Sequence, residues 1–185
     1  MSVTLTLFLE LWSGGDTDFL PPVGISNDDA DDPTKRQEAA ARFVAVNALV
    51  ATLLTYDKER FNHRNLALWT FRSALEYTSS APQDSEEGSW EGHVLAAAEI
   101  AETAGEKIRH WDFEFESGPF IGDMGAGGPL WDDKHGFCKG QWELWQRRFF
   151  ELSADTTEPL LSDRAREEAR MAGETVVRLS ARSGE

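Results

Sequence analysis

Residues 111–150 hold half of the chain's aromatic side chains in less than a quarter of its length. Aromatic rings are large and rigid, so the fold must either bury these rings in its core or use them to wall a pocket for an apolar ligand. The aromatic residues are Trp111, Phe113, Phe115, Phe120, Trp131, Phe137, Trp142, Trp145, Phe149 and Phe150. The sequence leaves both uses open.

Length and charge limit the organisation and the partners of the chain. A chain of 185 residues suits one domain with one core, so we expect a single domain over residues 1–185, with an acidic loop at 13–33 and an ordered loop at 117–139. The formal net charge is −15. Nucleic acids and anionic membranes are bound by clustered Lys and Arg, so we expect neither as a partner.

Cysteine and histidine usage argues against disulfides and metals. Cys138 is alone, which excludes an intramolecular disulfide and fits a reducing compartment, so we expect a cytoplasmic protein. Residues 3–12 are apolar but too short to span a membrane, and we interpret them as a packed element. The four histidines lack zinc-binding spacing and the glycine-rich run 118–128 lacks the ending of a phosphate loop, so we expect no metal and no cofactor.

Apolar residues recur at spacings of three and four along most of the chain, as is typical of amphipathic helices. Ser89 and Ser162 suit helix N-caps, and Pro33 suits a first helical turn. The expected helices cover about 33–56, 63–78, 90–108, 140–154 and 162–181. We therefore predict an all-α fold, a single-domain bundle of five or six helices with a long aromatic and glycine-rich loop at about 111–139.

Residues 111–116 alternate between aromatic and acidic side chains. A period of two is typical of a strand, and we expect an extended or irregular segment here. The acidic side chains Asp112, Glu114 and Glu116 would then face water. A carboxylate turned instead into an aromatic pocket would have its pKa raised by burial and could act as an acid.

Three segments carry a resemblance to a known family. Residues 68–76 read LWTFRSALE, residues 96–108 contain Ala-Gly-Glu-Lys, and residues 136–149 read GFCKGQWELWQRRF. In order and spacing, across roughly residues 60–180, the chain resembles a fungal family of uncharacterised proteins catalogued as domain of unknown function 3632. The resemblance implies a helical, cytosolic fungal protein, with members that sometimes sit beside secondary-metabolite genes. It supplies no catalytic residues.

Aromatic side chains are the candidates for an apolar binding site. Trp142, Trp145 and Phe149 form one stripe, and soluble helices usually bury such a stripe in the core. Trp69 and Phe71 lie two residues apart and so face different ways, which allows a cavity between the second and fourth helices. The candidate substrate-binding residues are Trp69, Trp111, Trp131, Trp142, Trp145 and Phe149.

Four polar side chains are candidates for an acid, a base or a hydrogen-bond donor at that site. His110 and His135 flank the aromatic region, with Asp112 close in sequence, and an imidazole is a side chain that can act as an acid or a base near neutral pH. Arg72 is a donor on the second helix, where it can also pair with Glu76 on the helix surface. The alternative for the histidines is ordinary exposure in an acidic loop. A nucleophilic Cys138 is not expected, because no activating base accompanies it.

Two functions fit these residues. The first is a small cofactor-independent enzyme of fungal secondary metabolism, of the cyclase, isomerase or dehydratase type, that holds an apolar small molecule in an aromatic pocket. The second is a non-catalytic helical module that binds a small molecule or a protein, and either function allows a homo-oligomer. A poised acid or base directed into an aromatic void would favour the enzyme.

Overall fold

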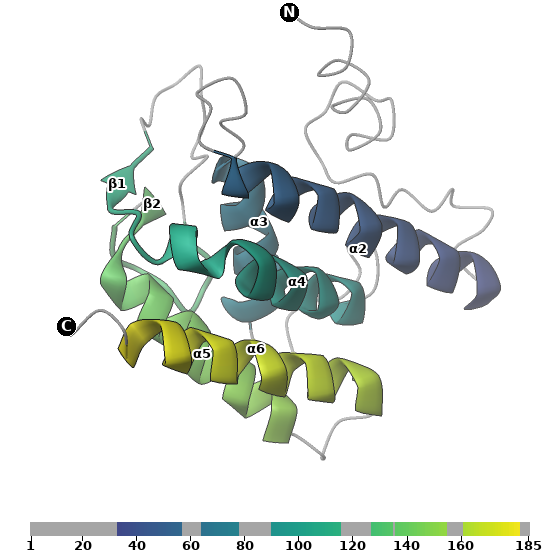
Figure 1. The fold of residues 1–185 in the computed structure, drawn as a ribbon. Coiled ribbons are helices and arrows are strands. Elements are labelled where there is room, and N and C mark those ends of the chain that lie inside the picture. The colour runs from purple at the N-terminus through teal and green to yellow at the C-terminus, as the bar shows by residue number, and fades with distance from the viewer. Residues whose placement is uncertain are drawn as a thin grey trace, which may run out of the picture.

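Helix α4 is buried along most of its length and lies at the centre of the helix packing. The computed structural model describes residues 33–56, 64–77, 90–115, 127–134, 136–154 and 161–181. The helices are α2 (Pro33–Thr55), α3 (Arg64–Leu75), α4 (Trp90–Ile108), α5 (Lys139–Ala154) and α6 (Asp163–Ala181). α2, α3 and α6 pack on α4, and α5 packs on α6 (Figure 1). The predicted all-α bundle is confirmed, with five helices in the described part of the chain.

Small side chains explain why α4 accepts several neighbours. Ala96, Ala97, Ala104 and Gly105 are all buried, as their size predicts. A Cβ atom built at Gly105 would lie 3.0 Å from Leu179 Cδ1 of α6, so the two helices approach closely there. Close approach at small residues gives the dense packing that protein interiors require.

The last helix begins as its cap residue predicts. The Ala165 backbone N–H donates to Ser162 Oγ at 3.2 Å, which is the N-cap hydrogen bond. The Glu91 carboxylate in turn accepts from the Ser162 N–H at 3.0 Å and from its hydroxyl at 2.9 Å. The start of α6 is therefore fixed to the first turn of α4.

A two-stranded antiparallel sheet lies within the loop predicted at 111–139. Strand β1 (Phe113–Glu114) pairs with β2 (Gly136–Phe137), with Phe113 opposite Phe137 and Glu114 opposite Gly136. Gly136 has a φ of +154°, and a Cβ atom there would lie 2.2 Å from the Phe113 carbonyl oxygen, so the pairing requires glycine. The extended segment expected at 111–116 is thus confirmed as far as residue 115.

Several expectations fall on parts of the chain that the structure does not describe. The packed element at 3–12, the acidic loop at 13–33 (apart from its final residue) and most of the glycine-rich run lie outside the described residues. None of the helices in the described ranges has the length and apolar character needed to cross a lipid bilayer.

Removing the α6 cap should weaken the fold measurably. Ser162→Ala keeps the backbone N–H contact with Glu91 but loses the hydroxyl's bonds to the Ala165 N–H and to Glu91 Oε1, so we expect a loss of about 1 kcal/mol in the free energy of unfolding. Ser153→Ala is the matched control, because within the described ranges its hydroxyl bonds only to the Phe150 carbonyl of its own helix. Urea titrations followed by circular dichroism measure both changes, and equal losses in the two variants would contradict the capping role.

Candidate functional site

Glu76, the first residue after α3, has a fully buried side chain. Its Oε1 accepts hydrogen bonds from Gln141 Nε2 and Trp145 Nε1, each at 2.7 Å. Its Oε2 accepts one from the Gly128 backbone N–H at 2.6 Å. An ionised carboxylate only accepts hydrogen bonds, so these donors match it. We refer to Glu76, Gln141, Trp145 and Gly128 as the Glu76 hub.

The predicted surface pair between Arg72 and Glu76 is wrong. α3 ends at Leu75, three residues before the predicted end, and Glu76 leaves the helix surface for the interior. Arg72 instead donates from Nη2 to the Tyr77 hydroxyl at 3.5 Å. A spacing of four supports an ion pair only while both residues stay in the helix.

The hub offsets the cost of burying a charged group. An ionised carboxylate removed from water costs several kcal/mol unless hydrogen bonds replace its hydration. Gln141 lies in the first turn of α5, and the N-terminal end of a helix favours negative charge nearby. The Gln141 Oε1 atom is buried without a hydrogen-bond partner among the described residues. The hydrogen bond that Gln141 makes in the core is therefore the one its Nε2 group donates to Glu76.

Gly128 attaches the segment 127–134 to the end of α3. Besides the contact of its N–H with the carboxylate, the Leu130 N–H donates to the Glu76 backbone carbonyl at 3.0 Å. A Cβ atom at position 128 would lie 2.7 Å from both the Cβ and the carbonyl oxygen of Glu76. Only glycine allows this approach, so one glycine of the predicted loop has a defined structural role.

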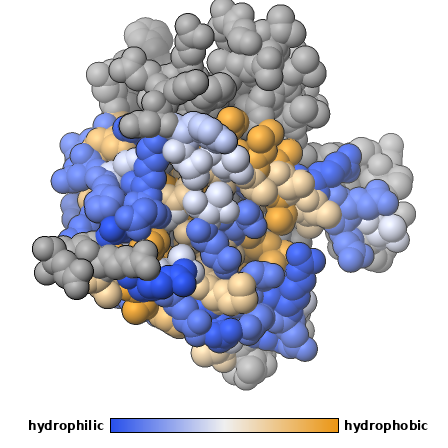
Figure 2. All heavy atoms as spheres, viewed as in Figure 1, coloured by the Kyte–Doolittle hydropathy of each residue, from blue (hydrophilic) through white to orange (hydrophobic). Residues whose placement is uncertain are grey.

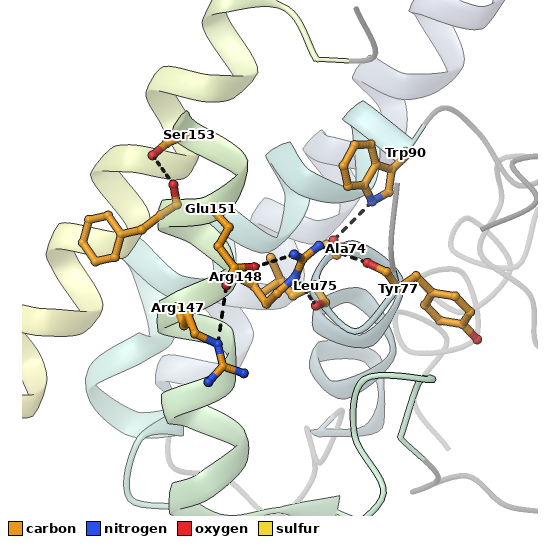
Figure 3. A network of polar contacts seen from close by, with 9 residues as sticks. Ala74, Leu75, Tyr77, Trp90, Arg147, Arg148, Glu151 and Ser153 are labelled. Carbon is orange, nitrogen blue, oxygen red and sulfur yellow. Dashed lines mark hydrogen bonds and ion pairs between the residues drawn. The ribbon is translucent and has the colours of Figure 1, made fainter. Parts of the chain in front are cut away.

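The carbonyl groups at the end of α3 are bound by side chains from two other helices. Trp90 Nε1 donates to the Ala74 carbonyl at 3.2 Å. The Arg148 guanidinium donates from Nε to the Leu75 carbonyl and from Nη2 to the Tyr77 carbonyl, both at 3.1 Å. Figure 3 shows Arg148 reaching from α5 to this helix end, with Trp90 on α4. A cation is favourable at a helix C-terminus, where carbonyls lack intrahelical partners.

The aromatic stripe of α5 is part of the core. Trp142, Trp145 and Phe149 are at most 6% exposed. Trp145 stacks on Phe71 of α3 with ring centroids 4.4 Å apart, and Trp142 packs edge-on against Trp145 at 6.0 Å. The Phe71–Trp145 stack therefore lies between the second and fourth predicted helices, where the sequence allowed a cavity.

A second group of aromatic residues lies around β1 and stays partly exposed. The Arg64 guanidinium lies 5.1 Å from the centre of the Trp111 ring and 4.9 Å from that of Phe113. Phe115 packs edge-on against Phe113 at 5.2 Å, and Trp111 packs edge-on against the buried Phe137 at 4.9 Å. We refer to Arg64, Trp111, Phe113 and Phe115 as the aromatic rim.

Trp69 and Trp131 belong to neither the α5 stripe nor the aromatic rim. Both are partly buried and pack against the core. Trp131 Nε1 donates to the Lys134 carbonyl at 3.0 Å, so its ring is fixed within the segment 127–134. Of the six predicted aromatic residues, three are buried on α5, and the other three are partly buried and pack against the same core.

His110 and Asp112, two of the polar candidates, are well exposed. The His110 side chain is 61% exposed, with Nε2 3.8 Å from Glu106 Oε1. Asp112 is 76% exposed and accepts a hydrogen bond from Lys134 Nζ at 2.6 Å, which raises the pKa of Lys134 above its usual value. His135 lies outside the described residues. Within the described ranges, no three His, Cys, Asp or Glu side chains are arranged to hold a metal ion.

Replacing the hub carboxylate with its amide should destabilise the protein strongly. Glu76→Gln keeps the shape, but its NH₂ group faces at least one hub donor, so we expect a loss of about 2–4 kcal/mol in the free energy of unfolding. Glu143→Gln on the exposed face of α5 is the control, with an expected change below about 0.5 kcal/mol. Guanidinium titration compares the two variants, and wild-type stability of Glu76→Gln would refute the role of the hub.

Two adjacent arginines give a matched test of the bonds at the end of α3. Arg148→Lys loses the planar fork that reaches both Leu75 and Tyr77, so we expect a loss of about 1–2 kcal/mol. The Arg147 side chain is 67% exposed and contacts Glu151 at 3.5 Å, so Arg147→Lys should be nearly neutral. Thermal unfolding of the two variants gives the comparison, and similar melting temperatures would contradict the capping role.

The comparisons with known proteins identify a family. No curated protein and no solved structure matches the chain. Residues 6–149 match the family described as Protein of unknown function (DUF3632), a range that begins and ends earlier than the resemblance seen in the sequence. The matched range contains the whole Glu76 hub, the aromatic rim and Arg148. The chain belongs to this family of proteins of unknown function, DUF3632.

Proposed function

We propose that this chain is a non-catalytic helical module that binds a protein partner through the aromatic rim. The observation that carries the proposal is the division of the aromatic residues into two groups. The α5 stripe is packed ring against ring in the core, whereas the rim around Arg64 and Trp111 stays partly exposed. The rim is thus available to a partner, and the stripe serves the fold.

The composition of the aromatic rim suits a binding hot spot. Tryptophan and arginine dominate the energy of protein interfaces, usually at a centre surrounded by polar residues. Arg64 already lies over two rings, so binding would order few additional rotatable bonds. The exposed Asp112 and Glu114 border the rim and supply a polar surround.

The charge of the chain indicates the class of partner. A net charge of −15 attracts basic surfaces at long range and repels acidic ones. Arg64 already places a cation over the Trp111 and Phe113 rings, so the ring surface that stays exposed suits an apolar side chain. We therefore favour a protein partner with a basic surface and an apolar anchor.

The cofactor-independent enzyme receives less support from the described residues. A cyclase, isomerase or dehydratase of this kind needs an acid or base that contacts its substrate. His110 and Asp112 are well exposed and lie beside Glu106 and Lys134, respectively. Glu76 is fully buried and occupied by three donors, so a substrate cannot reach it. A setting in fungal secondary metabolism is implied by the resemblance alone, and a cytoplasmic location by that resemblance and the lone Cys138.

Site-specific photocrosslinking in cells that express the protein tests the rim. A photoreactive residue at Glu114, next to the rim, should capture a partner that the same residue at Glu174 on α6 does not. Trp111→Ala should reduce the capture at least tenfold, because it removes the largest ring of the rim. Phe150→Ala, which shortens a partly exposed aromatic side chain outside the rim, should leave the capture unchanged.

The same experiment separates binding from catalysis. His110→Ala and Asp112→Asn should retain the capture and the cellular function, because neither side chain belongs to the rim and the amide of Asp112→Asn keeps a polar group at its border. Capture that survives Trp111→Ala in a folded protein would refute the proposal that the rim binds the partner. Loss of function in His110→Ala or Asp112→Asn with capture intact would support the enzyme instead.

A further inference from the structure

The outward face of α2 is apolar although it is exposed. From Phe43 to the end of the helix there is no charged residue, and the four charged side chains of α2 all precede this stretch. Leu49 is 47% exposed, and Tyr56, which directly follows the helix, is 59% exposed. Figure 2 shows hydrophobic residues gathered where α2 crosses this side of the molecule. An apolar helix face of this kind is typical of an interaction site.

The threonines on this face do not make it polar. Thr52 Oγ1 donates to the Ala48 carbonyl at 2.9 Å, and Thr55 Oγ1 donates to the Thr52 carbonyl at 2.7 Å. Both hydroxyl donors are therefore used within the helix, which lowers the cost of removing these side chains from water.

We propose that two copies of this chain associate through the α2 stripe, with the two α2 helices antiparallel. The stripe consists of the exposed Ala41, Ala45, Leu49, Thr52 and Tyr56 and the partly buried Ala48. This surface differs from the aromatic rim, so the inference does not depend on the function proposed above.

The stripe is complementary to itself in the antiparallel orientation. A two-fold axis that passes between residues 48 and 49 brings each stripe position opposite another stripe position of the second copy. The resulting pairs are Ala41 with Tyr56, Ala45 with Thr52, and Ala48 with Leu49. An alanine meets a larger side chain in every pair, so the surfaces interdigitate, and the two contacts related by the axis are identical, as a closed dimer requires.

Charge and size set the strength of this dimer. Each copy carries a net charge of −15, and the stripe carries no charged side chain from Phe43 to Tyr56. The exposed Arg42 lies near its N-terminal end and, in this register, opposite Thr55 of the second copy. The stripe is about 22 Å long at 1.5 Å per residue. It covers less than the roughly 800 Å² per partner of a standard interface. We therefore expect a weak, rapidly exchanging dimer that salt strengthens by screening the net repulsion.

Analytical ultracentrifugation of the full chain tests the proposal. Between about 5 and 500 µM the weight-average mass should rise towards twice the monomer mass, and added salt should shift the rise to lower concentration. Leu49→Glu should raise the dissociation constant at least tenfold with unchanged circular dichroism. Val177→Glu adds the same charge at a comparably exposed position of α6 and should keep the wild-type behaviour apart from a small electrostatic weakening.

Disulfide trapping tests the register and does not rely on Leu49→Glu. In a Cys138→Ser background, a mixture of Ala45→Cys and Thr52→Cys proteins should form a mixed disulfide dimer, whereas each variant alone should form few dimers. A wild-type chain that stays monomeric at every concentration and salt would overturn the proposal. Cross-linking of Ala45→Cys to itself as readily as to Thr52→Cys, or dimers that persist in Leu49→Glu, would overturn it as well.

Discussion

The buried carboxylate of Glu76 is the constraint on which the rest of the structure depends. It receives two donors from α5 and one from the segment 127–134, and the Glu76 backbone carbonyl accepts a fourth hydrogen bond from the Leu130 N–H. The α3 carbonyls beside it are bound by Trp90 of α4 and Arg148 of α5. One helix end therefore joins four parts of the chain. Few other side chains could replace those of the hub, because each buried donor needs an acceptor at a place that water cannot reach.

This arrangement decides how the aromatic residues are used. Trp145 donates to Glu76 from its indole nitrogen while its ring stacks on Phe71, so the same side chain satisfies the hub and fills the core. The α5 stripe is thereby committed to the fold. The aromatics around Arg64 pack against the core on one side and stay partly exposed on the other, so they are available for recognition. The separation of these two groups is why we favour binding over catalysis.

Local sequence patterns predicted much of the fold, but they did not predict the Glu76 hub. Periodicity, together with Pro33 in a first helical turn and the cap at Ser162, predicted five helices to within a few residues, because these signals act over one or two turns. Glu76 looked like the partner of Arg72 because the spacing alone cannot show that α3 ends at Leu75. Its true donors lie 52, 65 and 69 residues away. The one sequence signal was that Glu76, Gln141 and Trp145 fall within the segments that carry the family resemblance.

Native-state hydrogen exchange measured by NMR tests the central role of the hub most directly. The Gly128 and Leu130 amides lie outside the helices, yet both donate to Glu76, and the Trp145 indole N–H does the same. If the hub holds the fold together, these three protons exchange only when the whole domain unfolds, as slowly as the Ile100 and Ala101 amides of buried α4. Exchange of Gly128 and Leu130 at the rate of an exposed loop, with α4 still protected, would contradict the account.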